Sequence, residues 1–100
     1  MAARINLPMD QIRDFCKRWE IIEFALFGSV LRADFRDDSD VDVLVRFAPD
    51  AQWSLFDRMD MVDQLKAIFG RDVDLAIEDN LINPFRRKAI LRSKETVYAA

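Results

Sequence analysis

The chain has 100 residues, of which 51% are hydrophobic and 33% charged, with two Gly and three Pro, a composition typical of a folded globule and not of a disordered tail. This length predicts one domain over residues 1–100, with a modest core and no separate substrate domain. The net charge of −3 and the pI of about 4.9 argue against direct nucleic-acid binding, which needs a basic surface. Binding of a nucleotide together with a cation is compatible with this net charge and pI.

Residue types and the N-terminal sequence exclude several further classes. The chain has no His, so imidazole takes no part in any mechanism, and the acid–base work falls to carboxylates. The single Cys16 excludes an intrachain disulfide. Residues 1–8 lack the apolar core of a secretory signal, and no run approaches the ~18 apolar residues that would span a bilayer. We therefore expect a cytoplasmic protein that does not enter a membrane.

The first predicted elements are an amphipathic helix and a strand. Pro8 suits a first helical turn, and apolar side chains then recur at helical spacing, at Ile12, Phe15, Cys16 and Trp19. Cys16 is expected to be a small buried side chain and not a reactive thiol. The apolar run 21–27, interrupted by Glu23, predicts an inner strand covered on both sides.

A Gly-Ser turn follows that strand. Gly28 tolerates positive φ and lets backbone approach a ligand closely, and Ser29 can cap a short helix over residues 30–32. Because helix N-termini bind phosphate, this turn is a candidate anion site. The guanidinium of Arg32 could reach a phosphate or pair with Asp34 or another surface acid, and both interpretations stay open.

Two acids accompany the next strand. Residues 41–47 alternate at period two, with Val41, Val43 and Val45 on one face, so Asp40 and Asp42 are expected to project together from the other. Neighbouring carboxylates repel unless a cation lies between them. Hard oxygen ligands without His or Cys favour Mg²⁺ over Zn²⁺.

A second helix is predicted between Ser54, a candidate N-cap, and Gly70, a candidate stop. Its apolar stripe consists of Leu55, Met59, Val62, Leu65, Ile68 and Phe69. Trp53 and Phe56 lie at its beginning, where they form either the edge of the core or a patch for a partner helix.

The last third of the chain predicts a strand over 73–77, a helix after Asn83-Pro84 and a short edge strand at residues 96–98. Asp72 and Asp74 share one face of the first of these strands, and either could join the acids of the preceding strand and accept a proton from an attacking hydroxyl. The last helix is basic, through Arg86, Arg87, Lys88 and Arg92. Its charges could be a solvated face, or could meet an acidic partner or a triphosphate.

These motifs resemble the DNA polymerase beta-like nucleotidyltransferase superfamily, whose signature is Gly-Ser, about ten residues, then Asp-x-Asp. Gly28-Ser29 and Asp40-Val41-Asp42 match it. The chain more specifically resembles the minimal nucleotidyltransferases (MNT proteins), the antitoxin partners of HEPN toxins in prokaryotic toxin–antitoxin pairs, over nearly its whole length. One departure is Ala33, where the family usually has Gly after the arginine, and it bears on turn geometry and activity.

The resemblance implies an α/β (α+β) nucleotidyltransferase core, a small mixed sheet with helices packed mainly against one face. It implies two Mg²⁺ ions held by Asp40, Asp42 and Asp74, which makes Asp74 and not Asp72 the third acid and the group that deprotonates the acceptor.

The resemblance also implies the substrates. ATP would be the donor, with its β- and γ-phosphates at Gly28 and Ser29 and with Arg32 as a further nucleotide-binding residue. AMP would pass to a tyrosine of a cognate HEPN toxin, with release of pyrophosphate, as in type VII toxin–antitoxin systems. The alternatives are a non-catalytic binding antitoxin and a nucleotidyltransferase that modifies a small molecule, whose relatives usually carry an additional helical region.

Overall fold

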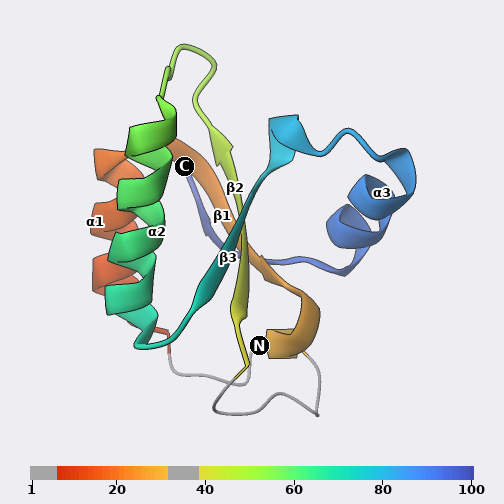
Figure 1. The fold of residues 1–100 in the computed structure, drawn as a ribbon, viewed down its shortest axis with the longest axis horizontal. Coiled ribbons are helices and arrows are strands. Elements are labelled where there is room, and N and C mark those ends of the chain that lie inside the picture. The colour runs from red at the N-terminus through yellow and green to blue at the C-terminus, as the bar shows by residue number, and fades with distance from the viewer. Residues whose placement is uncertain (1–6, 32–38) are drawn as a thin grey trace.

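The structure is a computed structural model that describes residues 7–31 and 39–100. Its elements, in chain order, are α1 (Met9–Arg18), β1 (Ile21–Phe27), the 3₁₀ turn η1 (Gly28–Leu31), β2 (Val41–Phe47), α2 (Leu55–Phe69), β3 (Val73–Ile77), the 3₁₀ turn η2 (Glu78–Asn80), α3 (Pro84–Ser93) and β4 (Glu95–Ala99) (Figure 1). The longer helices and the strands predicted from the sequence are all present. The short helix expected over residues 30–32 is replaced by η1, which begins at Gly28, and η2 is an addition.

The four strands form one mixed sheet in the order β3-β2-β1-β4. The strand β1 is antiparallel to both of its neighbours, whereas β2 and β3 are parallel. A parallel pair needs a crossover connection, and α2 supplies it. The sequence expectation that the strand bearing Asp74 neighbours the strand bearing Asp42 is confirmed.

The two faces of the sheet are covered differently. Helices α1 and α2 pack on one face, over a core that includes Phe24, Val43 and Leu65 (Figure 1). On the other face a smaller apolar cluster joins Leu44 of β2 to Ile90 of α3. The expectation of helices mainly on one face therefore holds for α1 and α2, while α3 covers part of the opposite face.

Local signals set the ends of α2 and α3. The Ser54 hydroxyl accepts a hydrogen bond from the Asp57 backbone N–H at 3.1 Å, and the Asp57 carboxylate accepts one from the Ser54 N–H at 2.9 Å, which forms a capping box. Gly70 ends α2 in the left-handed conformation, with φ 69°. At α3, the Asn83 side chain accepts from two backbone N–H groups and Pro84 occupies the first turn.

The residues of the helix layer confirm the expectation for Cys16 and give different outcomes for Trp53 and Phe56. Burial raises the pKa of the Cys16 thiol to about 12, which keeps the thiol protonated and unreactive at neutral pH. Trp53 belongs to the edge of the core, because its ring packs at 5.1 Å from that of Trp19 and its Nε1 donates to the Trp19 carbonyl. Phe56, by contrast, is 78% exposed.

A charged cluster attaches the C-terminal segment to the sheet. The Glu23 carboxylate of β1, 14% exposed, accepts hydrogen bonds from Lys94 and from the Thr96 hydroxyl. Arg46 of β2 lies 3.5 Å from Glu23 and 3.6 Å from Glu78. The hydrogen bond from Lys94 is the largest of the interactions that lower the pKa of Glu23. The cluster thus joins β1, β2 and η2 to the segment after α3.

None of the helices within residues 7–31 and 39–100 combines the length and the apolar character that a membrane span requires.

Replacing Glu23 with Gln should lower the free energy of unfolding by about 1 kcal/mol at neutral pH, because a partly buried, charge-assisted hydrogen bond to Lys94 is weakened. Lys94 holds the pKa of Glu23 below its ordinary value of 4.5, so this stabilisation is present above pH 4.5 and is lost as the pH falls through the folded-state pKa. Urea unfolding at neutral pH and at about pH 3 measures the difference. Asp60→Asn, at an exposed acid of α2, is the control and should change little at either pH.

Candidate active site

The turn after β1 brings backbone against a carboxylate. Gly28 has φ 71°, a conformation that favours glycine, and it begins η1 directly after β1. A Cβ built on Gly28 would lie 2.2 Å from Oδ2 of Asp42 and 3.1 Å from its Cγ. Phe27, the preceding residue, pairs with Asp42 across the β1–β2 ladder. The Asp42 carboxylate therefore lies directly over the Gly28 backbone, where no side chain fits.

Ser29 has a different local role from the one expected. It is the second residue of η1, so it does not cap a helix that starts after it. Its hydroxyl donates to the Asp40 carbonyl at 3.4 Å, which connects η1 to the residue just before β2. The end of β1 and the beginning of β2 are thereby held together.

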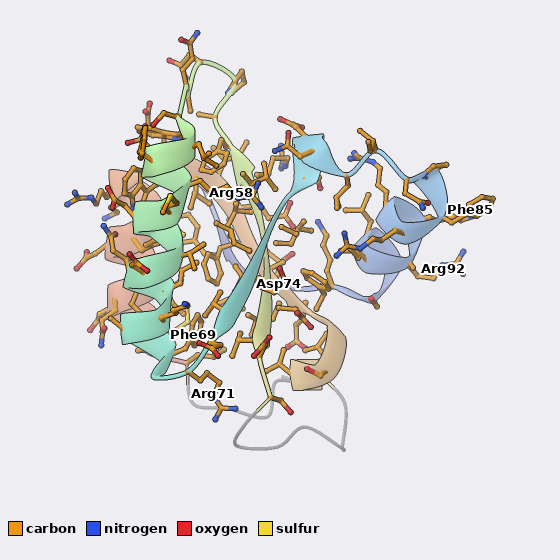
Figure 2. All side chains as sticks on the ribbon, viewed as in Figure 1. Arg58, Phe69, Arg71, Asp74, Phe85 and Arg92 are labelled. Carbon is orange, nitrogen blue, oxygen red and sulfur yellow. The ribbon has the colours of Figure 1, made fainter. Side chains whose placement is uncertain are left out.

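Asp42 and Asp74 are neighbours across the parallel strands. The two residues are paired in the β2–β3 register, one strand spacing apart. Both lie on the face opposite α1 and α2, since the residues that alternate with them, such as Val43 and Leu75, belong to the core under those helices. Asp40 lies one residue before β2 and is exposed. Figure 2 shows Asp74 on the side of β3 that faces α3.

The structure distinguishes the position of Asp74 from that of Asp72, which the period-two pattern of the sequence does not. Asp72 precedes β3 and its carboxylate lies 3.8 Å from Lys66 of α2. Asp74 lies within β3, beside Asp42, and its carboxylate has no hydrogen-bond or ion-pair partner among the described residues. Asp74 is thus the acid that the fold aligns with β2.

The donor set suits a hard divalent cation. No group of three or more potential metal ligands is gathered closely in the described parts of the chain, 7–31 and 39–100. Magnesium, however, is commonly held by one or two carboxylates together with water and substrate phosphates, and not by a full protein cage. The carboxylate of Asp42 over the Gly28 backbone, with Asp74 beside it, fits that mode. Arg32 and Ala33 lie outside the described residues.

A Gly-Ser turn against one carboxylate, with a second carboxylate aligned on the next strand, is an arrangement that can hold a triphosphate and a cation together. The family model described as a nucleotidyltransferase domain matches residues 9–97. The chain belongs to this nucleotidyltransferase family. The resemblance inferred from the sequence is confirmed, and nucleotidyltransferases act on a nucleoside triphosphate with a divalent metal ion.

The chain is similar to one curated protein and two solved structures, as follows. The protein adenylyltransferase MntA of Thermococcus cleftensis is 34% identical over 86 residues, which are 86% of this chain and 82% of the relative. A solved structure described as a minimal nucleotidyltransferase is 31% identical, has a TM-score of 0.71 and covers 87% of this chain and 86% of that one. A structure of tri-AMPylated Shewanella oneidensis HEPN toxin in complex with MNT antitoxin has a TM-score of 0.67 at 17% identity, over 92% of this chain and 70% of that one, and shares the fold.

A cavity of about 210 Å³ adjoins Asp74 at the outer edge of the sheet. We name it the β3-edge cavity; it is lined by residues 74–77 of β3 and by Arg58, Asn80, Leu81 and Arg86. The Arg58 guanidinium reaches it from α2 and donates to the Leu75 carbonyl at 2.9 Å (Figure 2). Sequence reasoning missed Arg58 and Asn80, because neither belongs to a motif and only the fold brings them beside Asp74.

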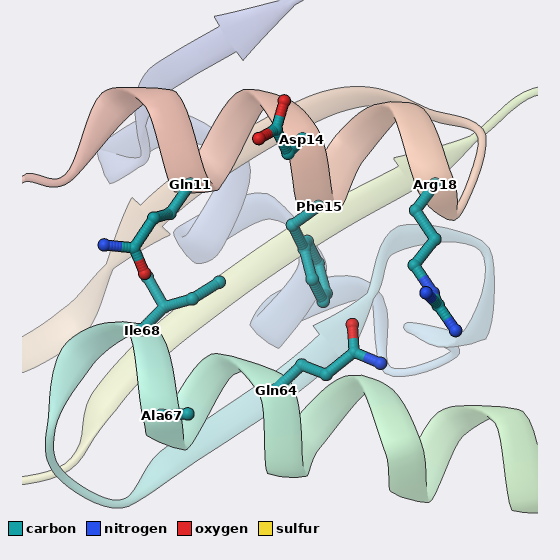
Figure 3. Close-up of a pocket in the computed structure, with 7 residues that line it drawn as sticks. All are labelled: Gln11, Asp14, Phe15, Arg18, Gln64, Ala67 and Ile68. Atoms are coloured by element: carbon teal, nitrogen blue, oxygen red, sulfur yellow. The ribbon is translucent and has the colours of Figure 1, made fainter.

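A larger cavity, of about 330 Å³, lies between α1 and α2 (Figure 3). Phe15 and Arg18 of α1 face Gln64 and Ile68 of α2 across it. Trp19 donates to Gln64 at 3.0 Å near one end, which holds the two helices together. The cavity belongs to the helix layer and is separated from Asp42 and Asp74 by the sheet, so it is not part of the candidate active site.

Replacing Gly28 with Ala should lower the free energy of unfolding by about 2 kcal/mol, because the left-handed backbone would be strained and the Asp42 carboxylate would have to move away from the new Cβ. Gly70→Ala is a matched control, since Gly70 has φ 69° but nothing within 4 Å of its Cβ position. That control should cost only about 1 kcal/mol, from backbone conformation alone. Urea unfolding of both variants measures the difference, and equal losses would contradict the close contact.

Proposed function

We propose that this nucleotidyltransferase transfers AMP from ATP to a tyrosine hydroxyl of a cognate HEPN toxin and thereby acts as the antitoxin of the pair. The observation that carries the proposal is the alignment of Asp42 with Asp74 on adjacent parallel strands, next to the Gly28 backbone. The name of the Thermococcus relative supports AMP as the transferred group and a protein as the acceptor. The HEPN toxin in the AMPylated complex supports the choice of partner.

The donor phosphates are assigned to the turn after β1. Gly28 and Ser29 would hold the β- and γ-phosphates through the turn after β1, while the absence of a side chain at Gly28 makes room for the Asp42 carboxylate, which would hold the cation beside them. Arg32, which follows η1 in the chain, would add a guanidinium to the same phosphates. When bound, the triphosphate would be oriented by these residues, and its α-phosphate would be the group that reacts beside the carboxylates.

The acids are assigned to metal binding and to proton transfer. Asp40 and Asp42 would bind Mg²⁺, with Asp74 contributing to a second ion. When bound, such ions would offset the negative charge of the triphosphate and stabilise the charge that develops on the leaving pyrophosphate. Asp74, one strand further from the Gly28 turn, would accept the proton of the acceptor hydroxyl.

Exposed apolar side chains support a protein acceptor. Large hydrophobic residues are strongly exposed at the beginning of α2, at Leu55 and Phe56, and before and within the first turn of α3, at Ile82 and Phe85. Such surfaces are typical of protein interaction sites. A small-molecule acceptor is the alternative, and the name of the Thermococcus relative, a protein adenylyltransferase, argues against it. A non-catalytic antitoxin is the second candidate, and the test below separates it from the enzyme.

The double substitution Asp40→Asn with Asp42→Asn should reduce transfer of label from α-³²P-ATP to the HEPN protein by several orders of magnitude, because the metal's charge stabilisation is worth several kcal/mol. The fold should persist, since neither side chain belongs to the apolar core. Circular dichroism checks the fold. A wild type that transfers no label, beside a double variant that still neutralises the toxin, would replace the enzyme with the binding antitoxin.

Asp74→Asn should lower kcat for transfer about 10²-fold or more, because an amide cannot accept the proton of the acceptor. Asp72→Asn is the matched control, two residues away in the chain, and should retain nearly full activity because Asp72 pairs with Lys66 outside β3. Steady-state label transfer with both variants tests the assignment. Equal losses for the two, or a loss confined to Asp72→Asn, would contradict it.

A further inference from the structure

We propose that the β3-edge cavity is the acceptor subsite of this nucleotidyltransferase, and that Arg58 and Arg86 bind an anionic group of the acceptor protein beside its reacting hydroxyl. The inference rests on the proposed function, because it takes the donor phosphates to lie at the Gly28 turn. It adds a binding site, and two residues that act on the acceptor, to the nucleotide-binding and metal-binding residues already assigned.

The order of the strands indicates the side from which the acceptor approaches. Gly28 follows β1, Asp42 is on β2, Asp74 is on β3, and the cavity lies beyond Asp74 at the outer edge of the sheet. In an in-line displacement at the α-phosphate, the attacking oxygen enters opposite the leaving pyrophosphate. If the pyrophosphate leaves toward Gly28, the acceptor must approach from the β3 side. The β3-edge cavity adjoins Asp74 on that side.

The cavity is chemically suited to an anion. Its lining includes two arginines, Arg58 and Arg86, together with Asn80 and a single acidic residue, Asp74. Arg58 uses one of its five N–H donors on the Leu75 carbonyl, which holds the guanidinium in place and leaves the others available. The Arg86 guanidinium has no hydrogen-bond or ion-pair partner within residues 7–31 and 39–100. Guanidinium groups bind carboxylates and phosphates with directed, charge-assisted hydrogen bonds.

The surroundings of the cavity favour a protein over a small molecule. Two further cavities, of about 260 and 290 Å³, also have Arg58 in their walls, and both extend to Leu55, which is 72% exposed. Arg58 donates to the Leu75 carbonyl at the open edge of β3 and so competes with the pairing of a further strand at this position, which favours recognition of the acceptor through side chains. An acceptor segment would then extend from Asp74 past Arg58 toward Leu55.

The reaction balances without a further reactant. The acceptor oxygen forms a bond to the α-phosphorus, the bond between that phosphorus and the bridging oxygen breaks, pyrophosphate leaves with the electron pair, and the acceptor proton passes to Asp74. Two anionic groups with the same chemistry could bind the two arginines. One is a carboxylate of the acceptor protein at the first transfer, and the other is the phosphodiester that the first transfer leaves on the acceptor.

The test uses Arg86→Glu, since this side chain has no structural partner to lose, with Arg86→Lys as the conservative variant. Arg92→Glu is the matched control, because Arg92 is also an exposed cation of α3 but lies on its outer side (Figure 2). Label transfer from α-³²P-ATP to the cognate HEPN protein gives kcat and KM for the acceptor. Calorimetry with Mg-ATP gives nucleotide affinity, and calorimetry with the HEPN protein gives partner affinity.

We expect Arg86→Glu to raise KM for the acceptor by about tenfold or more, with nucleotide affinity unchanged, Arg86→Lys to recover most of the loss, and Arg92→Glu to behave as wild type. Mass spectrometry of the acceptor, which counts the AMP groups added, distinguishes the two anionic groups. A slower first transfer indicates a carboxylate of the acceptor protein, whereas a normal first transfer followed by slower later ones indicates the phosphodiester.

Two results would overturn the assignment. If Arg86→Glu and Arg92→Glu act alike at every transfer, the cavity does not bind the acceptor. If Arg86→Glu weakens Mg-ATP binding by the same factor as it raises KM, the cavity belongs to the nucleotide. A wild type without any transfer would refute the proposed function separately. In that case the affinity for the HEPN protein tests the cavity by itself. If Arg86→Glu leaves this affinity unchanged, the cavity is not the surface that binds the HEPN protein.

Discussion

The parallel pairing of β2 with β3 is the constraint on which the candidate active site depends. This register places Asp74 beside Asp42, and a slip of one residue would turn Asp74 toward the apolar core under α2. A parallel pair cannot be closed by a hairpin, so the chain must cross over through α2. The capping box at Ser54 and the left-handed Gly70 define where that helix begins and ends. The ends of α2 therefore bear directly on the alignment of the acids.

The asymmetry of the two faces allows a charged site on so small a sheet. Helices α1 and α2 bury one face, and their core stabilises the domain without contribution from the acids. The opposite face is covered by α3 only in part, which leaves Asp42 and Asp74 outside the apolar clusters. Glu23 and Lys94 attach the segment after α3 at some distance along that face. The placement of α3 thus sets how much of the face stays open beside the acids.

The basic residues of α3 differ in role although they are adjacent in sequence. Arg87 donates to the Glu78 carbonyl at 2.8 Å and attaches the helix to η2, whereas Arg86 lines the cavity beside Asp74. Arg92 lies on the outer side. A stretch that reads as one positive run is divided by the helical period among a structural contact, a cavity and solvent. Charge composition alone would not distinguish these three positions.

The sequence by itself determined the helices and strands, and it determined that Gly28 and Asp42 lie together in the candidate active site. Period-two alternation predicts β2 and β3, cap residues predict the ends of α2, and Gly28 lies close enough to Asp42 in the chain for a short connection to bring them together. These signals are local, so they survive without knowledge of packing.

Only the tertiary structure decided which face α3 covers, that Glu23 meets Lys94 across 71 positions, and that Arg58 reaches the β3 edge beside Asp74. It also distinguished Asp74 from Asp72. Both residues fit the same period-two pattern, but Asp74 lies inside β3, whereas Asp72 precedes it and pairs with Lys66. The physical reason is that periodicity states which side chains share a face of an element. It does not state which other element that face meets.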